Sequence, residues 1–484
     1  MQKKLLAVAV AGALAAPAVA LAQSSVTVSG NINFWYETAG ATGATNTVPT
    51  AGGTVSTFDV KNRDRMQDGN GSNIRFTAVE DLGTGMQAFA QIESAVGNQL
   101  NMRNDGVSNG AGAVTTTQTG GGWATRNSGV GLRGQAWGEV LIGIWDVHYN
   151  EQYGTDGLLI KAASHMSMLG LLNGFGMTGT STGAGALGGV QIGARYSNVI
   201  RYQSPNWGGF SFRAAYARPT DNAVPVNNSA ATANVTDGSK NKMVNFAPQF
   251  NMGGIHVGLS YLKDSDIQTA QTTMFGGASV FNTAGGGAVA LGGAGAGLAV
   301  GSAPVGAASA ATNLTTITST RLFGAYSFPF GLKIGLLYDQ SKLDLKSSGT
   351  NFGSSQFKRN VWGIPVAYTI GAHTIGASYA QASKLTGSVG GAGGTSIGVS
   401  DIGVTPSGAT AGTTQAWGDN SKAKFYMIGY TYDLSKRTNI HAAYTQIKND
   451  NLTGYDFFAN ASGMAGTNFG ADPRIIQVGL RHAF

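Results

Sequence analysis

Segments whose side chains alternate in polarity with a period of two recur along the whole chain, and they limit what it can fold into. In residues 26–37, Val28, Ile32, Phe34 and Tyr36 share one face, while polar side chains occupy most of the other face. Such alternation is typical of a β-strand with one apolar and one polar surface. No segment after the N-terminus reaches about 18 apolar residues without glycine or polar interruption, which excludes a bundle of membrane-spanning helices.

The connections between these segments alternate between very short turns and long polar loops. Gly, Pro, Asn and Asp fill the short turns because they adopt turn conformations readily. Seven strand pairs are expected around such turns: 72–82 with 86–95, 124–133 with 139–147, 196–204 with 210–218, 242–251 with 255–264, 319–328 with 332–341, 358–370 with 374–381 and 422–432 with 439–448. A first strand over 25–37 and a last strand over 474–484 bring the expected count to sixteen. The long connections cover about 38–71, 96–123, 148–195, 219–241, 265–318, 342–357, 382–421 and 449–473.

This asymmetry predicts an all-β fold, namely a 16-stranded antiparallel transmembrane β-barrel with short periplasmic turns and long extracellular loops. An even number of strands lets the two chain ends pair and removes the sheet edge, and sixteen strands leave a lumen wide enough for water. The composition agrees, because charged residues are 11% of the chain, against about 25% in ordinary globular proteins. Cysteine is absent, which excludes a disulfide framework and a thiolate metal site.

The first 22 residues have the pattern of a cleaved signal peptide. Lys3 and Lys4 form a basic start, an apolar run follows, Pro17 breaks it, and Ala20-Leu21-Ala22 supplies a small-residue cleavage site. We therefore expect a signal peptide over 1–22 and a single barrel domain over 23–484. Loss of the two lysines lowers the formal net charge of +7 by two.

The last strand shows the alternation most clearly and ends on an aromatic residue. One face is suited to lipid and carries Ile476, Val478, Leu480, His482 and Phe484, and the other carries Ile475, Gln477, Gly479 and Arg481. A terminal aromatic residue after an alternating strand is what the outer-membrane assembly machinery generally recognises. Phe484 is therefore predicted to close the barrel and to mark the C-terminal strand for the barrel-assembly machinery.

Several ordered motifs resemble those of the general porins of β-proteobacteria. The resemblance covers essentially the whole mature chain and rests on Ser72-Asn73-Ile74-Arg75-Phe76, Glu80-Asp81-Leu82-Gly83-Thr84-Gly85, Trp137-Gly138-Glu139-Val140, the segment 200–211, Leu434-Ser435-Lys436-Arg437-Thr438 and the ending from Asp472 to Phe484. It implies a homotrimeric Gram-negative outer-membrane porin, an integral protein whose third loop, here 148–195, folds into the barrel and narrows the pore. The family often has an arginine after the glycine that closes the preceding strand, whereas this chain has Gly143-Ile144-Trp145-Asp146.

The alternation assigns charged side chains to the lumen. The predicted basic pore wall consists of Arg75, Arg133, Arg201, Arg213, Lys333, Arg359 and Arg481, and Arg75, Arg133 and Arg201 are expected to face the third loop. Acidic candidates are Asp146, Glu151 and Asp156 on that loop or at its base, with Glu37, Glu93 and Asp339 on strands. The alternatives for each arginine are a structural ion pair and a position above the membrane near lipopolysaccharide. Since a cleft with an excess of one sign concentrates counter-ions, weak anion selectivity is expected.

The predicted function is a water-filled passive diffusion channel for small hydrophilic solutes and ions. The alternative on the same barrel is a substrate-selective channel for organic acids, phosphate or sugars. An enzyme is disfavoured because none of the six histidines lies in an H-E-x-x-H arrangement. A surface antigen or adhesin is suggested only by the long loops, and the Gly/Ala-rich segments 276–312 and 385–416 are more simply explained as tolerant surface loops.

No cofactor is expected, and metal binding is weakly supported. Residues 68–73 are rich in calcium-ligand types but lack the spaced glutamate of an EF-hand. The basic residues form no cluster with aromatic side chains, so nucleic acid is not an expected partner. The expected partners are two further copies of the chain, outer-membrane lipid and lipopolysaccharide, the barrel-assembly machinery, and small solutes and ions.

Overall fold

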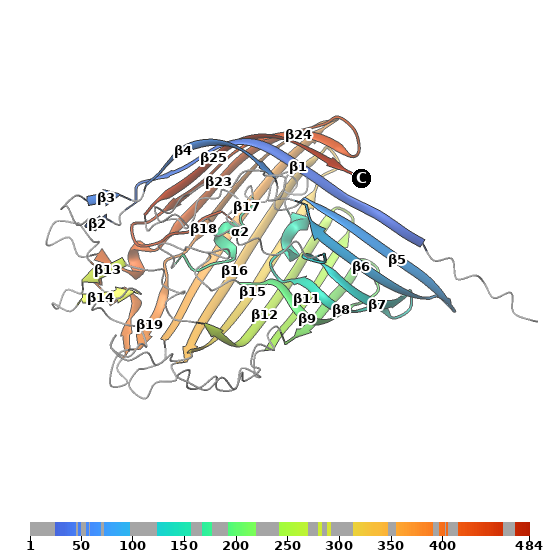
Figure 1. Cartoon of the computed structure of the whole chain (residues 1–484), viewed down its shortest axis with the longest axis horizontal. Helices are drawn as coiled ribbons and strands as arrows, with labels where there is room; N and C mark the ends of the chain where they lie inside the picture. Colours follow the sequence, from blue (N-terminus) through green and yellow to red (C-terminus); the bar gives the residue numbers. More distant parts are fainter. Residues whose placement is uncertain are drawn as a thin grey trace, which may run out of the picture.

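The alternating segments pair edge to edge in a computed structural model, where they form a closed antiparallel barrel of sixteen strands, as predicted. The structure describes residues 25–44, 47–49, 55–57, 59–68, 72–96, 123–155, 167–176, 192–218, 242–269, 279–282, 288–291, 313–346, 355–390, 396–401, 403–404, 415–457 and 470–484. The predicted signal peptide lies outside the described residues. The short strands β2, β3, β13 and β14 lie at one end of the barrel, and the short turns and the C-terminus lie at the other (Figure 1).

The barrel wall follows the order of the chain. Its strands are β1 (Ser25–Thr42), β4 (Val60–Asp68) continued by β5 (Asn73–Gly83), β6 (Met86–Ala95), β7 (Ser128–Gly134), β8 (Gly138–Val147), β9 (Ala194–Gln203), β10 (Phe210–Ala217), β11 (Lys242–Met252), β12 (Ile255–Thr269), β15 (Asn313–Ser327), β16 (Leu332–Lys346), β17 (Ser355–Ile370), β18 (His373–Ala382) continued by β19 (Thr386–Gly390), β23 (Ala423–Asp433), β24 (Thr438–Asn449) and β25 (Asp472–Ala483). The remaining elements are β2 (Thr47–Pro49), β3 (Val55–Thr57), β13 (Ser279–Asn282), β14 (Ala288–Leu291), β20 (Ser396–Gly398), β21 (Gly403–Val404), β22 (Gln415–Ala416), η1 (Glu151–Thr155), α2 (Leu169–Leu172), η5 (Val399–Asp401) and η6 (Gly418–Asn420). None of the described helices is long and apolar enough to cross a membrane.

The first and last strands close the barrel. β1 pairs with β25 from Asn31 opposite Ala483 to Thr42 opposite Asp472, and its other edge pairs with β4 and β5. One residue further, the Phe484 N–H donates to the Gly30 carbonyl and the Gly30 N–H donates to the Phe484 carbonyl, each at 3.0 Å. The chain ends therefore leave no long open edge at the seam.

Several strands extend further toward the long-loop end than the sequence predicted. β1 and β4 occupy much of the predicted loop 38–71, and β16 continues five residues beyond 341, where a loop was expected. The continuation is possible because strand hydrogen bonds do not depend on side-chain polarity, so charged residues such as Lys342 can occupy the outward face above the apolar band. Short strands also lie in segments that were expected to be loops, β19 to β22 within 385–416 and the β13–β14 hairpin within 276–312.

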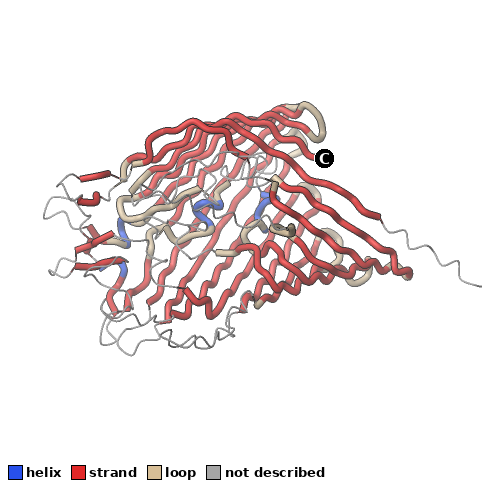
Figure 2. The backbone as a smooth tube through the Cα atoms, viewed as in Figure 1, coloured by secondary structure: helices blue, strands red, loops and turns tan. Residues whose placement is uncertain are grey.

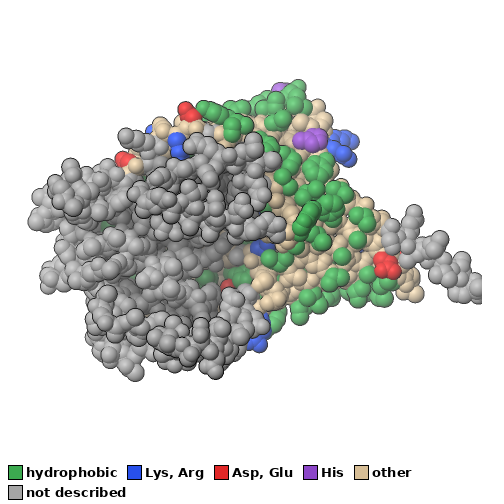
Figure 3. All heavy atoms as spheres, in the orientation of Figure 1, with side chains coloured by type: hydrophobic (Ala, Val, Ile, Leu, Met, Phe, Trp, Pro, Cys, Tyr) green, Lys and Arg blue, Asp and Glu red, His purple; other side chains and the backbone are tan. Residues whose placement is uncertain are grey.

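The two faces of the wall differ as the alternation predicted. On β17, Arg359 and Val361 are buried on the inner face, while Trp362, Ile364 and Val366 are exposed on the outer face. Hydrophobic side chains spread over the visible outer surface near the short-turn end (Figure 3). This arrangement places apolar groups toward lipid and polar groups toward the lumen.

Candidate functional site

The described parts of the segment between β8 and β9 lie inside the barrel and pack on its inner wall. The η1 and α2 helices lie inside the ring of strands (Figure 2), and the described residues 167–176 are all buried. Leu169, Leu171 and Leu172 belong to a hydrophobic cluster with Leu337, Phe425 and other side chains of the inner wall. The described parts of the predicted third loop, 148–195, therefore narrow the lumen.

A buried ionic cluster holds the first part of this loop. Arg321 of β15 has its Nε 2.9 Å from an Asp339 carboxylate oxygen on β16, and both side chains are fully buried. The other end of the guanidinium donates to the Gln152 side-chain carbonyl at 2.8 Å and to the backbone carbonyls of His148 and Tyr149 at 3.3 Å. Charge-assisted hydrogen bonds of this kind are the strong ones, so Arg321 fixes the loop to the wall.

Arg359 of β17 holds the second part of the loop. Its guanidinium donates to the Leu172 carbonyl at 2.5 Å and to the Gly174 carbonyl at 2.6 Å, and it lies over the Phe175 ring. The side chain is fully buried and lies 3.6 Å from Asp339. The structure thus places this predicted pore-wall residue beneath the loop and away from water, where two backbone carbonyls of the loop accept from its Nε and one terminal nitrogen.

His148 lies at the start of the loop in a buried network of hydroxyl groups. Its two ring nitrogens are 2.8 Å from the Ser260 hydroxyl and 2.9 Å from the Ser319 hydroxyl. Burial, reinforced by the Arg321 charge, lowers the pKa of His148 well below its ordinary value of 6.5. The ring is therefore neutral at physiological pH and serves as a hydrogen-bonded support of the loop.

Two further predicted basic residues also contact the loop. Arg213 of β10 lies 2.8 Å from the Glu151 carboxylate, and the Lys333 ammonium of β16 donates to the Gly154 carbonyl at 2.6 Å. The carboxylate of Glu151 on the loop thus faces Arg213 on the wall, whereas Asp156 lies outside the described residues.

The wall formed by β5 to β9 carries a second set of charges above the short turns. On β6, Glu93 accepts from Arg75 at 3.0 Å and from Arg126 at 2.5 Å, so two arginines share one carboxylate. Asp146, at the base of the loop, pairs with Arg195 at 2.8 Å. The predicted acid at the loop base is therefore neutralised locally, while the Arg75 side chain stays 39% exposed.

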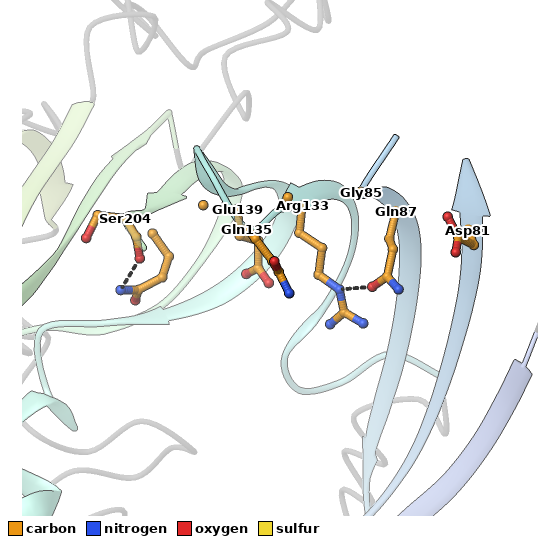
Figure 4. A pocket seen from close by; sticks show the side chains of 10 residues that line it. Asp81, Gly85, Gln87, Arg133, Gln135, Glu139 and Ser204 are labelled. Carbon is orange, nitrogen blue, oxygen red and sulfur yellow. Dashed lines mark hydrogen bonds between the residues drawn. The ribbon is translucent and has the colours of Figure 1, made fainter. Parts of the chain in front are cut away.

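The same wall continues as a charge row toward the short turns. Arg133 of β7 lies opposite Glu139 of β8, and Glu139 lies 3.3 Å from Arg201 of β9. Arg133 also donates to the Gln87 side chain at 2.9 Å. Arg133, Glu139 and Gln87 border a cavity of about 460 Å³ that is also lined by Asp81, Gln135, Gln203 and Ser204. Figure 4 shows Arg133, Gln87, Gln135 and Glu139 side by side along it.

The remaining strand candidates lie away from this row. Arg481 on β25 is half-buried and has no ion-pair partner within 4 Å among the residues that the structure describes. Glu37 on β1 is buried and accepts from the Trp35 indole N–H at 2.6 Å. Within the described parts of the chain, no three His, Cys, Asp or Glu side chains gather as a metal site.

Sequence reasoning missed four charged residues of the site. Arg321 alternates with Ser319 and Phe323 on the inner face of its strand, so the period of two could have assigned it to the lumen. Glu139 could have been found from its register opposite Arg133. The alternation does not predict on which face Arg126 and Arg195 lie. Arg126 precedes β7, which begins at Ser128. Arg195 lies beyond a register shift between Gly143 and Trp145 in the β8–β9 pairing.

Lowering the pH is expected to increase anion preference through Glu151. Burial raises the pKa of Glu151 from its ordinary value of 4.5, although Arg213 opposes this shift. As the pH is lowered from the neutral into the acidic range and passes the raised pKa, the carboxylate takes up a proton and loses its charge, while Arg213 remains a cation.

Reversal potentials measured across this pH range would test the effect. In the matched variant Glu151→Gln, anion preference should already be raised at pH 7 and should change less with pH. An equal pH dependence in the variant and the parent protein would contradict the assignment.

Comparisons with known proteins agree with the closed barrel. The family model described as Gram-negative porin matches residues 7–292 and 226–452. The chain is 26% identical over 432 residues to an outer membrane porin protein of Bordetella pertussis, covering 86% of this chain and 83% of that protein.

Solved structures show the same fold. The anion-selective porin from Comamonas acidovorans has a TM-score of 0.53 at 18% identity, covering 96% of this chain and 100% of that one. OmpT of Vibrio cholerae has a TM-score of 0.52 at 13% identity, with 95% and 98% covered. With the family match over most of its length and its 16-stranded barrel, the chain belongs to the Gram-negative porin family and is an integral outer-membrane channel protein.

Proposed function

We propose that the chain forms a passive diffusion channel for small hydrophilic solutes and ions with a weak preference for anions. The observation that carries this proposal is the pairing on the open wall of β5 to β9. Glu93 is shared by Arg75 and Arg126, and Glu139 lies between Arg133 and Arg201. Each set has one more cation than anion, and such an excess raises the local concentration of anions.

Planar-bilayer recording in a salt gradient tests this proposal. The parent protein should give a reversal potential on the anion side, and the variant Arg75→Gln/Arg133→Gln should shift it toward cations. The control Lys436→Gln/Arg437→Gln removes the same charge from an exposed short turn and should leave the reversal potential near that of the parent. An unchanged potential in the first variant would refute the assigned role of the wall.

A substrate-selective channel is the second candidate, and the cavity beside Arg133 favours it. Ligand pockets commonly have volumes of about 300–1,000 Å³, and this one measures about 460 Å³. Its guanidinium and amide groups could donate hydrogen bonds to a small carboxylate or phosphate. Saturable block of the conductance by one such solute would favour this function, while a linear dependence on solute concentration would favour general diffusion.

A homotrimer is the assembly we propose, and its support is the solved trimer form of OmpT from Vibrio cholerae, which has a TM-score of 0.51 to this chain. Three-step closure in bilayers and native electrophoresis would test it. The related proteins are channels, and we assign no enzymatic activity. The signal peptide, the barrel-assembly machinery and lipopolysaccharide remain predictions.

A further inference from the structure

The outward face of β17, β18, β23 and β24 carries an unusual order of side chains near the extracellular end. One row across β18, β23 and β24 consists of Gln381, Lys424 and Lys448 in direct register. The next row toward the membrane centre runs from Ile364 through Tyr379 and Tyr426 to Gln446, again in register. From the first row to the second, two residues closer to the membrane centre, the outward side chains thus change from mainly basic to tyrosines and neutral residues.

The two lysines lie directly opposite each other. Like charges in this position of an antiparallel pair are destabilising. Among the described residues, neither lysine has a carboxylate within 4 Å. Asp472 attracts Lys448 only through a Coulomb interaction at longer range. By contrast, Lys342 and Lys384, also near the extracellular end, pair with Asp344 and Asp419 at 2.9 and 2.7 Å. Among the described residues, the lysine pair therefore has no carboxylate as close as those that pair with Lys342 and Lys384.

An apolar hollow lies directly below the lysine pair. This tyrosine groove has a volume of about 470 Å³ and is lined by side chains that include Ile364, Val366, Tyr379, Tyr426, Ile428 and Tyr444. Ala377 lies in register between Val366 and Ile428, and its small side chain leaves the space open.

The tyrosine hydroxyl groups point to the upper rim of the groove. Tyr379 donates to the Gln381 side chain at 3.1 Å, and Tyr444 donates to the Gln446 side chain at 3.0 Å. Tyrosine prefers such a position at the membrane–water interface, with its ring in the apolar layer. The groove thus begins at the headgroup level and continues into the apolar layer.

We propose that the tyrosine groove binds an acyl chain of a phosphorylated lipid of the outer leaflet, whose phosphate lies between Lys424 and Lys448. The extracellular position of the long loops in such barrels places this rim in the outer leaflet. Charge complementarity selects an anionic headgroup, and the apolar groove selects a lipid over a free anion. The proposal rests on the outer-membrane location and is independent of ion selectivity.

Native mass spectrometry of the full-length protein in neutral detergent tests the site. The probes are bisphosphorylated lipid A, the same lipid without phosphates, and inorganic phosphate. The parent protein should retain the bisphosphorylated lipid. The variant Lys424→Gln/Lys448→Gln should bind it about 30-fold more weakly, since each basic side chain near an anionic surface contributes about fivefold.

Two further variants separate the components of the site. Lys436→Gln/Arg437→Gln removes the same charge from the other end of the β23–β24 hairpin and should bind like the parent. Ala377→Trp fills the groove and should weaken lipid binding although both lysines remain. Heat-dependent electrophoretic mobility would verify that each variant is a folded barrel, and bilayer conductance of the lysine variant should equal that of the parent.

Three results would overturn the proposal. Equal retention of the lipid with and without phosphates would remove the role of the lysines. Displacement of the lipid by millimolar inorganic phosphate, with no effect of Ala377→Trp, would indicate a simple anion site. Dissociation of the oligomer by Ala377→Trp, without lipid on the parent protein, would show that a second copy of the chain covers the groove.

Discussion

The double variant Arg321→Met/Arg359→Met is expected to release the inward loop and to raise the single-channel conductance. The two arginines donate to backbone carbonyls on both described parts of the loop, and Asp339 lies between them. Removing one partner of a buried ion pair typically costs about 3–5 kcal/mol, because the other charge is left uncompensated. The double variant also removes the hydrogen bonds that hold both described parts of the loop to the wall, so the loop should leave the lumen.

Single-channel recording and permeation of larger neutral solutes would measure this opening. Lys342→Met is the matched control, since it breaks an ion pair on the outer face of β16 that is partly exposed. Such pairs contribute about 0–1 kcal/mol, and this control should conduct like the parent. A folded double variant with parental conductance and parental solute size limit would show that the arginine cluster does not hold the constriction.

Deleting Phe484 is expected to open the barrel seam at the short-turn end and to lower its stability. Two hydrogen bonds join this residue to Gly30, and each contributes about 1 kcal/mol. The ring is 39% exposed and packs beside Gly30, where an added Cβ would lie 2.9 Å from the ring. Partial burial of an aromatic side chain adds about 1–2 kcal/mol, so the free energy of unfolding should fall by about 3 kcal/mol.

Urea unfolding after refolding into vesicles would measure this loss without the assembly machinery. Phe484→Tyr keeps the backbone pair and most of the ring contact, and it should behave like the parent. If the deletion variant unfolds at the same urea concentration as the parent, Phe484 does not close the barrel. A defect confined to cells would instead indicate recognition of the C-terminal strand.

The extent of each strand was only partly predictable from the residues. The short turns could be located from glycine. Gly331, for example, has a φ of +96°, a conformation that favours glycine over other residues. At the long-loop end, Lys342 and Asp344 alternate with buried Leu343, but the charged outward face no longer distinguishes a strand from a loop. For strands such as β1 and β16, apolar patterning therefore located the membrane-embedded part and missed the extension toward the long-loop end.

The alternation of side chains by itself determined the barrel, its sixteen strands and the inward direction of Arg75, Arg133 and Arg201, because a period of two assigns each residue to one face. Only the tertiary structure decided which charges remain on the open wall. Arg359 and Arg321 share the inward parity of Arg133, yet the loop that folds over them takes their hydrogen bonds and removes them from water. The alternation specifies on which face of the sheet a side chain lies. The group that it contacts on that face depends on a loop that is distant in the sequence.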